Sequence, residues 1–402
     1  MSNSMRSQVL TSVALLTLAS VSPALAQKVT TVPDLTGKQV LEQMANQGAG
    51  GVSGDSIAIA TATEIATAPF GTSSGGFNFK LDPASGLLQR TTTSFGPSFV
   101  ERALTAGEGK VSAGATFSST NYDKLSDFSL TNLPMGTVTA GSPLVTGTTT
   151  GNLKISSSTL AMSGSVGVTP KLDVGVVVPL VTVKLSGTSA TVNGNGVVSR
   201  LVEMNNVFSG LGDIAAFGKF RIAKFKGPDV PDPGGIALNV IMRLPTGSRD
   251  NLRGLGVTRT LGSLVASFGK GPLKPHGSVS FEYWNKAVDV PNDHLKNQFQ
   301  YNGGVEIVAA PKVTLLADVL GQKVLGAGPV QFNSVNPVAG IGATAAQSLV
   351  FADGSIDKIT FIPGLKVNLI GKMVLSLNAL VTMKNNGLHS KITPVAGINL
   401  TK

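Results

Sequence analysis

The sequence predicts an all-β protein: a transmembrane, antiparallel, up-and-down β-barrel of about 12 strands, within a range of 12 to 14. Three observations lead to this fold class. Mean hydropathy is positive and only 13% of residues are charged, yet beyond residue 26 no apolar run is long enough for a spanning helix. Apolar and polar residues alternate with a period of two from Lys110 onward. Short and long links between the alternating segments also follow one another, as they do in barrels of the bacterial outer membrane.

Residues 1–26 have the features of a secretory signal peptide. Arg6 supplies the positive start, residues 9–20 are apolar and uncharged, and Ala24-Leu25-Ala26 offers the small residues that a signal peptidase requires. We therefore expect cleavage after Ala26 and export across the inner membrane of a Gram-negative-type bacterium to its outer membrane. An uncleaved signal anchor is the alternative.

Residues 27–109 differ from the rest and are expected to form an N-terminal periplasmic segment or a plug that enters the barrel. Pro33 to Thr36 reads as a helix start, and an apolar stripe at helical spacing follows it. The Gly/Ser/Ala/Thr-rich stretch 48–76 is expected to be flexible, and residues 97–105 to form a second short helix. A plain linker is the alternative for this region.

The barrel domain is predicted to comprise residues 110–402, because the alternation is long and regular there. In residues 361–369, for example, Phe361, Leu365 and Leu369 share one face, opposite Ile362 and Lys366. The predicted strands are 110–121, 153–168, 172–188, 211–225, 235–245, 259–269, 276–285, 298–309, 312–321, 358–369, 372–383 and 391–401.

The connections form two sets, which indicate two different rims. Links near residues 169–171, 271–275, 310–311 and 370–371 are tight, whereas 189–210, 246–258, 286–297 and 322–357 are expected to be long loops. An even number of strands places both ends of the barrel domain on the rim with the short links. Two features oppose a membrane barrel: aromatic residues are only 5%, and the chain ends on Lys402 without a terminal phenylalanine. A secreted β-sandwich therefore stays open as an alternative.

The composition argues against several classes of site. The chain has no cysteine, which excludes thiolate chemistry and disulfides. Its formal charge of +10 is spread along the chain without interleaved aromatic residues, so a nucleic-acid partner is not expected. His276, His294 and His389 lack metal-ligand spacing, and we expect no metal, no cofactor and no enzymatic activity. An outer-membrane hydrolase built from a serine and one of these histidines is the least favoured alternative.

The polar face of the alternating strands is where function can be sought. Charged side chains are costly against lipid, so they are expected to line the lumen. The predicted lumen-lining residues are Lys219, Arg221, Arg243, Asp318, Lys366 and Asn378, with Asp173, Glu282 and Glu306 as further counter-charges. Whether they select a solute or only pair with one another is left open by the sequence.

Several short segments, in this order, resemble the outer-membrane transporter family labelled "putative MetA-pathway of phenol degradation". They are Pro97–Ala103, Gly107–Lys110, Gly167–Pro179, Gly210–Ile214, Arg243–Gly247, Lys274–Gly277, Pro363–Val367 and Gly387-Leu388. The resemblance implies a β-barrel related to channels for aromatic hydrocarbons and fatty acids, and it does not imply an enzyme of phenol breakdown. The Gly/Ser-rich stretch and the basic charge depart from the family pattern.

The leading functional hypothesis is a passive outer-membrane channel for small hydrophobic or aromatic compounds. Its expected partners are outer-membrane lipid and such a solute; the oligomeric state is not predicted. The alternative is a non-transporting structural or surface-binding β-barrel or sandwich, whose contact site would be the long loop 322–357.

Overall fold

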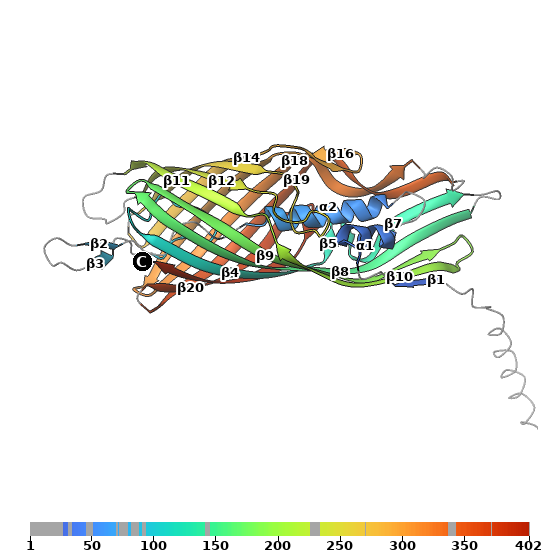
Figure 1. Cartoon of the computed structure of the whole chain (residues 1–402), viewed down its shortest axis with the longest axis horizontal. Coiled ribbons are helices and arrows are strands. Elements are labelled where there is room, and N and C mark those ends of the chain that lie inside the picture. The colour runs from blue at the N-terminus through green and yellow to red at the C-terminus, as the bar shows by residue number, and fades with distance from the viewer. Residues whose placement is uncertain are drawn as a thin grey trace, which may run out of the picture.

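The computed structural model describes residues 27–30, 34–45, 51–69, 71, 79–81, 88–90, 94–140, 145–225, 234–269, 271–336, 343–370 and 372–401. The predicted signal peptide, residues 1–26, lies outside these ranges. Strands dominate the described chain, and they wind around one long axis (Figure 1).

A closed ring of 12 antiparallel strands forms the body of the molecule, as the sequence predicts. The seam closes where the last strand pairs with the first, with Thr401 opposite Ser112. In ring order the strands are β4 (Val111–Tyr122), β8 (Val145–Thr169), β9 (Leu172–Val192), β11 (Ala215–Lys224), β12 (Gly234–Arg243), β13 (Arg259–Phe268), β14 (Leu273–Trp284), β17 (Gln298–Ala310), β18 (Val313–Val335), β19 (Ala343–Ile370), β20 (Met373–Asn385) and β22 (Ile392–Thr401).

On this ring the predicted alternation places apolar side chains on the outside and the residues between them on the inside. On β12, Leu238, Val240 and Met242 are 40–43% exposed on the outside, whereas Ala237 and Asn239 are at most 1% exposed on the inside. The same holds on the other strands, whose outward residues include Phe117, Leu160, Leu180, Leu264, Phe281, Tyr301, Val319, Phe361, Leu377 and Ile398. Together they form a continuous outward apolar band, which suits the hydrocarbon interior of a bilayer.

One end of the barrel, which we call the turn end, carries short links and both ends of the ring. The short connections from β8 to β9, from β17 to β18 and from β19 to β20 lie there. The start of β14 at Leu273 lies there as well. A small hairpin of β2 (Phe79–Leu81) and β3 (Leu88–Arg90) also lies at this end (Figure 1).

At the opposite end the sheet continues well beyond the ring, and two of the predicted long loops are wrong there. Residues 322–335 and 343–357 form the outer halves of β18 and β19, and residues 189–192 and 198–210 belong to β9 and β10 (Val198–Leu211). β7 (Thr131–Ala140) bridges β8 and β19, and β1 (Gln27–Thr30) pairs with β10 in parallel. We call this part, residues 131–140, 145–156, 181–209, 322–336 and 343–357 together with the helices 37–45 and 52–67, the extension.

The polarity of the strands inverts where the extension begins. On β9, Val174, Val176 and Leu180 face outward, but from residue 181 the apolar Val181, Val183 and Leu185 face inward. The outward positions there are polar. A strand that leaves lipid and enters water must turn its apolar side to the interior, so the inversion marks the edge of the membrane-spanning part.

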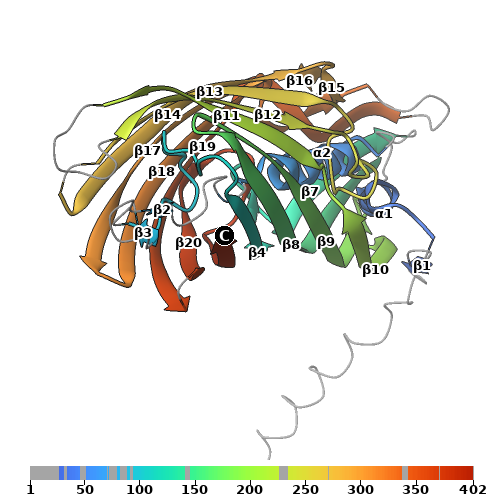
Figure 2. The ribbon, with the colours of Figure 1, turned by 60° about the vertical axis from the view of Figure 1, so that its left-hand side comes forward.

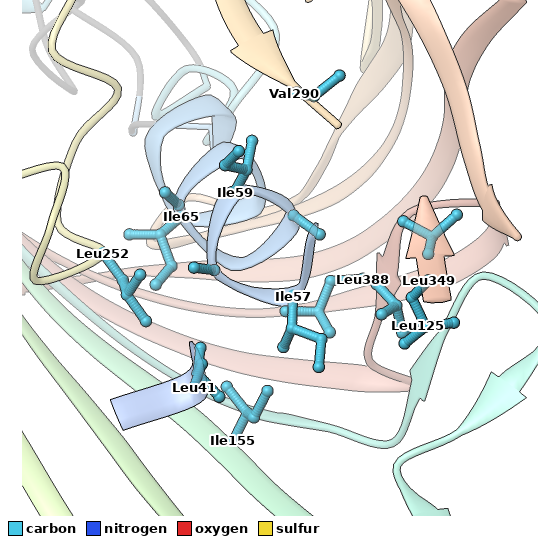
Figure 3. Packing of buried hydrophobic residues seen from close by; sticks show 14 of the residues in the cluster. Leu41, Ile57, Ile59, Ile65, Leu125, Ile155, Leu252, Val290, Leu349 and Leu388 are labelled. Carbon is cyan, nitrogen blue, oxygen red and sulfur yellow. The ribbon is translucent and has the colours of Figure 1, made fainter. Parts of the chain in front are cut away.

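Two helices fill the interior of the extension, α1 (Gly37–Ala45) and α2 (Val52–Thr67). The first agrees with the predicted apolar stripe, but the expected flexibility of residues 48–76 is wrong for 52–67. Small and β-branched residues let α2 be buried all round, and its neighbours in the core include Leu41, Ile155, Leu252, Leu349 and Leu388 (Figure 3). Neither of these helices is long and apolar enough to cross a membrane.

Short strands complete the rim of the extension. β5 (Lys124–Leu125), β6 (Phe128–Ser129) and β21 (Leu388–His389) form one small sheet, and β15 (Val288–Val290) pairs with β16 (Asp293–Leu295). Figure 2 shows the helices between the walls of the extension, at the far end from β2 and β3. Leu125 and Leu295 are completely buried and join these strands to the core around α2.

Candidate functional site: the barrel lumen

The lumen is crossed by residues 94–106, which we call the crossing segment. Its apolar side chains are buried against inward residues of widely separated strands. Phe95 packs against Val374 of β20, and Val100 against Leu320 of β18 and Ile362 of β19. Ala103 packs against Ala237 and Val265 on the far wall. The segment therefore reaches both sides of the barrel interior.

The crossing segment is not the short helix that the sequence suggests for residues 97–105. A non-helical backbone in a closed interior must find partners for its N–H groups elsewhere. Carboxylates of the barrel wall supply some of them: Gly96 N donates to Glu306 Oε2 at 3.1 Å, and Ala106 N donates to Asp173 Oδ2 at 2.8 Å. The wall thus replaces the hydrogen bonds that a helix would have made within itself.

Buried charged side chains also attach the crossing segment to the barrel wall. Lys219 Nζ lies 3.1 Å from Glu101 Oε2, and Lys219 is not exposed at all. Arg102 Nη1 lies 3.7 Å from Glu306 Oε2, and Lys366 Nζ donates to the carbonyl oxygen of Pro97 at 2.7 Å. Such charges are tolerated inside a protein only when they are paired.

The six predicted lumen residues lie on the inner side of the wall, but they have different neighbours. Lys219 and Lys366 bind the crossing segment, and Asp318 Oδ1 accepts a hydrogen bond from His276 Nε2 at 3.1 Å. Arg221 lies at the turn-end rim, where it donates to the carbonyl oxygen of Pro170. Contact of any of the six with a solute stays a prediction.

Arg243 and Asn378 occupy other parts of the lumen. Arg243 Nε lies 3.3 Å from Glu282 Oε1, within the charged cluster near the extension, and Asn378 lines a cavity together with Lys366. The pairing of Arg243 with Glu282 agrees with the counter-charge expected from the sequence.

Arg259 is the central residue of that cluster, and the sequence reading did not single it out. It is fully buried, contacts Asp213 Oδ2 at 3.2 Å and Glu282 Oε2 at 3.5 Å, and lies over the ring of Trp284. It also donates to the carbonyl oxygen of Ala66 at 2.9 Å, near the C-terminus of α2. Arg259 lies on the same inward face of β13 as Leu261, so the alternation could have revealed its position. Its contact with α2 could not be predicted from the sequence of β13.

The last turn of α2 therefore points its carbonyl groups at cationic and polar side chains. Besides Arg259, Gln322 Nε2 donates to the carbonyl oxygen of Thr67 at 3.2 Å, and Lys358 pairs with Glu64. Helix C-termini carry partial negative charge, which Arg259 favourably opposes. This arrangement fixes the end of α2 at the entrance from the extension to the lumen.

Three cavities that share wall residues adjoin the crossing segment. Their atom-free space, part of which is open to solvent, amounts to about 950, 810 and 470 Å³, and all three have Gly71 and Phe99 in their walls. The largest is rich in hydroxyl groups, which come from Thr116, Ser118, Thr120, Ser157, Thr159, Thr360, Thr382, Ser390 and Thr393. Its apolar lining includes Leu380 and Val395 as well as Phe99.

The charged groups that line the largest cavity already have partners. Glu64 and Lys358 pair with each other, Asp213 pairs with Arg259, and Arg253 donates to the carbonyl oxygen of Leu211. The space itself is consequently bordered mainly by neutral hydroxyl and apolar groups. A neutral solute could contact these groups without competing for an ion pair.

The three histidines have carboxylate neighbours. His276 is buried, with Nδ1 3.1 Å from the carbonyl oxygen of Lys274 and Nε2 at Asp318. His294 lies beside Asp293, and His389 Nδ1 lies 2.8 Å from Asp123. Both ring nitrogens of His276 are thus engaged, so neither is placed to accept a proton from a serine. Among the described residues no group of three His, Cys, Asp or Glu side chains could hold a metal ion.

Comparison with known proteins gives architectural likenesses only. No family model and no curated protein matches this chain. Among solved structures, a Pseudomonas aeruginosa FadL homologue has 10% identity and a TM-score of 0.32, with 73% of this chain and 90% of that chain covered.

Two further solved structures have comparable scores. The P. putida toluene transporter TodX has 9% identity and a TM-score of 0.32 over 74% of this chain and 90% of that chain. The beta domain of the Bordetella autotransporter BrkA has 9% identity and a TM-score of 0.35 over 73% and 100%. These likenesses are too weak to indicate a function, and the family resemblance of the motifs stays a prediction.

Proposed function

We propose that this chain is an outer-membrane β-barrel through which small hydrophobic or aromatic compounds pass down their concentration gradient. The observation that carries the proposal is the set of adjoining cavities inside a barrel with an outward apolar band. All three cavities have Phe99 in their walls, so the crossing segment narrows the lumen without filling it. We assign no catalytic role to any residue.

The lining of the largest cavity favours neutral solutes with a large apolar surface. Phe99 and Leu380 offer apolar contacts, while the surrounding threonine and serine hydroxyls can accept or donate single hydrogen bonds. An anion or cation would have to leave water and enter a space whose charged groups are already paired. Ionic solutes therefore meet a higher barrier than neutral ones.

The N-terminal region has two roles in this proposal. The crossing segment acts as an internal plug, held by Lys219, Glu306 and Lys366. The two helices lie in the extension, away from the turn end, and form a second constriction next to the largest cavity. Residues 1–26 would direct export, and the turn end would face the periplasm.

Uptake of a neutral aromatic dye by intact cells tests the proposal. Cells that express the protein should take up N-phenyl-1-naphthylamine faster than cells with an empty vector. The anionic analogue 8-anilinonaphthalene-1-sulfonate should gain much less. Thr360→Trp, which fills the largest cavity, should reduce uptake of the neutral dye, and Thr188→Trp on the outer surface of the extension is the matched control.

A non-transporting structural barrel is the second candidate, because buried ion pairs hold the crossing segment across the lumen. In that case the protein would not raise uptake of either dye above the empty-vector level. Thr360→Trp and Thr188→Trp would then be indistinguishable from the parent protein in uptake.

A further inference from the structure

The outer surface of β4, β8, β9 and β10 changes its chemistry abruptly at the edge of the apolar band. One cross-strand row consists of four exposed apolar residues: Phe117, Leu160, Leu180 and Leu211. The next outward row towards the extension consists only of hydroxyl residues: Ser119, Ser158, Thr182 and Ser209. Acyl chains can contact the first row, whereas the second row requires polar neighbours.

Two lysines follow directly above the hydroxyl row. Lys184 of β9 stands opposite Ser156 of β8, and Lys154 of β8 stands opposite Ser186 of β9. They are therefore diagonal neighbours on one face, at a spacing of about 7–8 Å between backbone positions. Both are exposed, and neither forms an ion pair with any residue that the structure describes.

The outward residues around Lys154 and Lys184 leave this part of the outer surface positively charged. They are Asn121 of β4 and Val207 and Asn205 of β10, with Glu203 on the next outward row of β10. A single carboxylate does not offset two ammonium groups. Two like charges at this distance repel each other, and an anionic partner would relieve that repulsion.

Two other exposed lysines have a carboxylate partner. Lys323 and Lys384 lie 3.4 and 3.5 Å from the two carboxylate oxygens of Asp357. Burial acts to raise the pKa of Asp357, but the hydrogen bond from Ser355 and the two lysines outweigh it, so that the pKa is lowered. Those lysines are already neutralised in part, and they provide a natural comparison for Lys154 and Lys184.

We propose that Lys154, Lys184 and the adjoining hydroxyl row bind the phosphorylated sugar headgroup of an anionic glycolipid, whose acyl chains lie on the row from Phe117 to Leu211. The inference rests on the proposed outer-membrane location, in which the extension faces the outside of the cell. Ammonium groups suit phosphate, and serine, threonine and asparagine side chains suit sugar hydroxyls. Continuity with the apolar row favours a lipid over free phosphate, because both parts of one molecule can bind at once.

The test uses the refolded full-length protein in detergent and bisphosphorylated lipid A as the probe, with binding measured by native mass spectrometry. The double variant K154Q/K184Q should bind roughly thirtyfold more weakly, since each lysine near an anionic surface contributes to affinity. The control K323Q/K384Q should bind like the parent protein. Fully dephosphorylated lipid A should bind to the parent protein as weakly as intact lipid A binds to K154Q/K184Q.

Three outcomes would overturn the lipid site. They are equal binding by both double variants, no effect of removing the phosphates, or displacement of lipid A by millimolar inorganic phosphate, which would indicate a simple anion site. Retention of the folded barrel is checked by circular dichroism for every variant. Dye uptake is measured on the same variants, so that a failure of the lipid site is distinguished from a failure of the proposed transport.

Discussion

At the scale of single residues, buried ion pairs hold the crossing segment in place. Lys219 is wholly buried between Glu101 of the segment and the wall, where its charge also acts on Asp173. Removing one partner of a buried pair leaves the other charge without compensation, which usually costs more than replacing both partners. The pairing therefore matters more for where the segment lies than for the net stability of the barrel.

We predict that Lys219→Met lowers the free energy of unfolding by about 3–5 kcal/mol. Adding Glu101→Met to the same chain should recover part of that loss, because it removes one of the carboxylates left uncompensated. Urea unfolding in lipid vesicles measures the single variants and the double variant. Costs that simply add in the double variant would contradict a direct interaction between the two side chains.

The outward apolar residues give a second prediction at this scale. Val240 lies in the middle of the outward row on β12, so Val240→Arg should destabilise the folded barrel in vesicles by roughly 2–4 kcal/mol. Thr188→Arg, on the outer face of the extension, should cost roughly 0–1 kcal/mol. Equal costs at the two positions would mean that Val240 does not face hydrocarbon.

At the scale of elements, the contact between α1 and α2 depends on a single glycine. A Cβ atom on Gly54 would lie 2.4–2.6 Å from backbone atoms of Leu41 and Glu42. That distance is far shorter than van der Waals contact, so the two helices could not keep their separation. Gly262 on β13 has open space around its Cβ position and provides the control.

We therefore predict that Gly54→Val exposes the helices to proteolysis while the barrel stays folded. Limited digestion of the refolded protein with thermolysin, which cleaves beside apolar residues, should release fragments from residues 37–67 in Gly54→Val, but not in Gly262→Ala. The barrel fragment from residue 110 onward should remain resistant in both. Resistance of the helices in Gly54→Val would mean that they are held without close mutual packing.

The elements show which information the sequence carries and which it does not. Strands such as β12 and β20 could be predicted from the sequence, because all their outward residues face the same apolar environment and the alternation is therefore unbroken. The outer half of β18 and most of β10 were predicted as loops; on β18 the outward residues change from apolar, such as Val319, to polar, such as Lys323, so no single pattern spans the strand. Helix α2 was missed because its Ala- and Thr-rich sequence has little amphipathic pattern and is buried on every side.

The candidate site was predictable to a similar extent. Inward parity identified Lys219, Arg243, Asp318 and Lys366 as interior residues, since charge cannot cheaply face lipid. It could not identify their partners, because Glu101 and Pro97 lie on a segment without periodic pattern. The geometry of such a segment is decided by tertiary contacts that only the assembled barrel provides.

At the scale of the whole molecule, closure of the ring between β22 and β4 should make the barrel resistant to detergent. The backbone pairs from Val395 opposite Ser118 to Thr401 opposite Ser112 leave no free edge within the ring. We expect the protein extracted from outer membranes to migrate faster on a gel when unheated than when boiled. Identical migration of both samples would argue against a closed barrel.

The most direct test of the account is the accessibility of spin labels along β12 and β9 in lipid vesicles. The chain contains no cysteine, so a single introduced cysteine carries the label at one known position. Labels at residues 236–244 should be accessible to oxygen in the bilayer with a period of two, highest at even positions such as 238 and 240. On β9, outward positions beyond residue 181, such as 184 and 188, should instead be accessible to a water-soluble relaxation agent. Uniform accessibility to that agent along both strands would contradict the placement of these side chains in lipid.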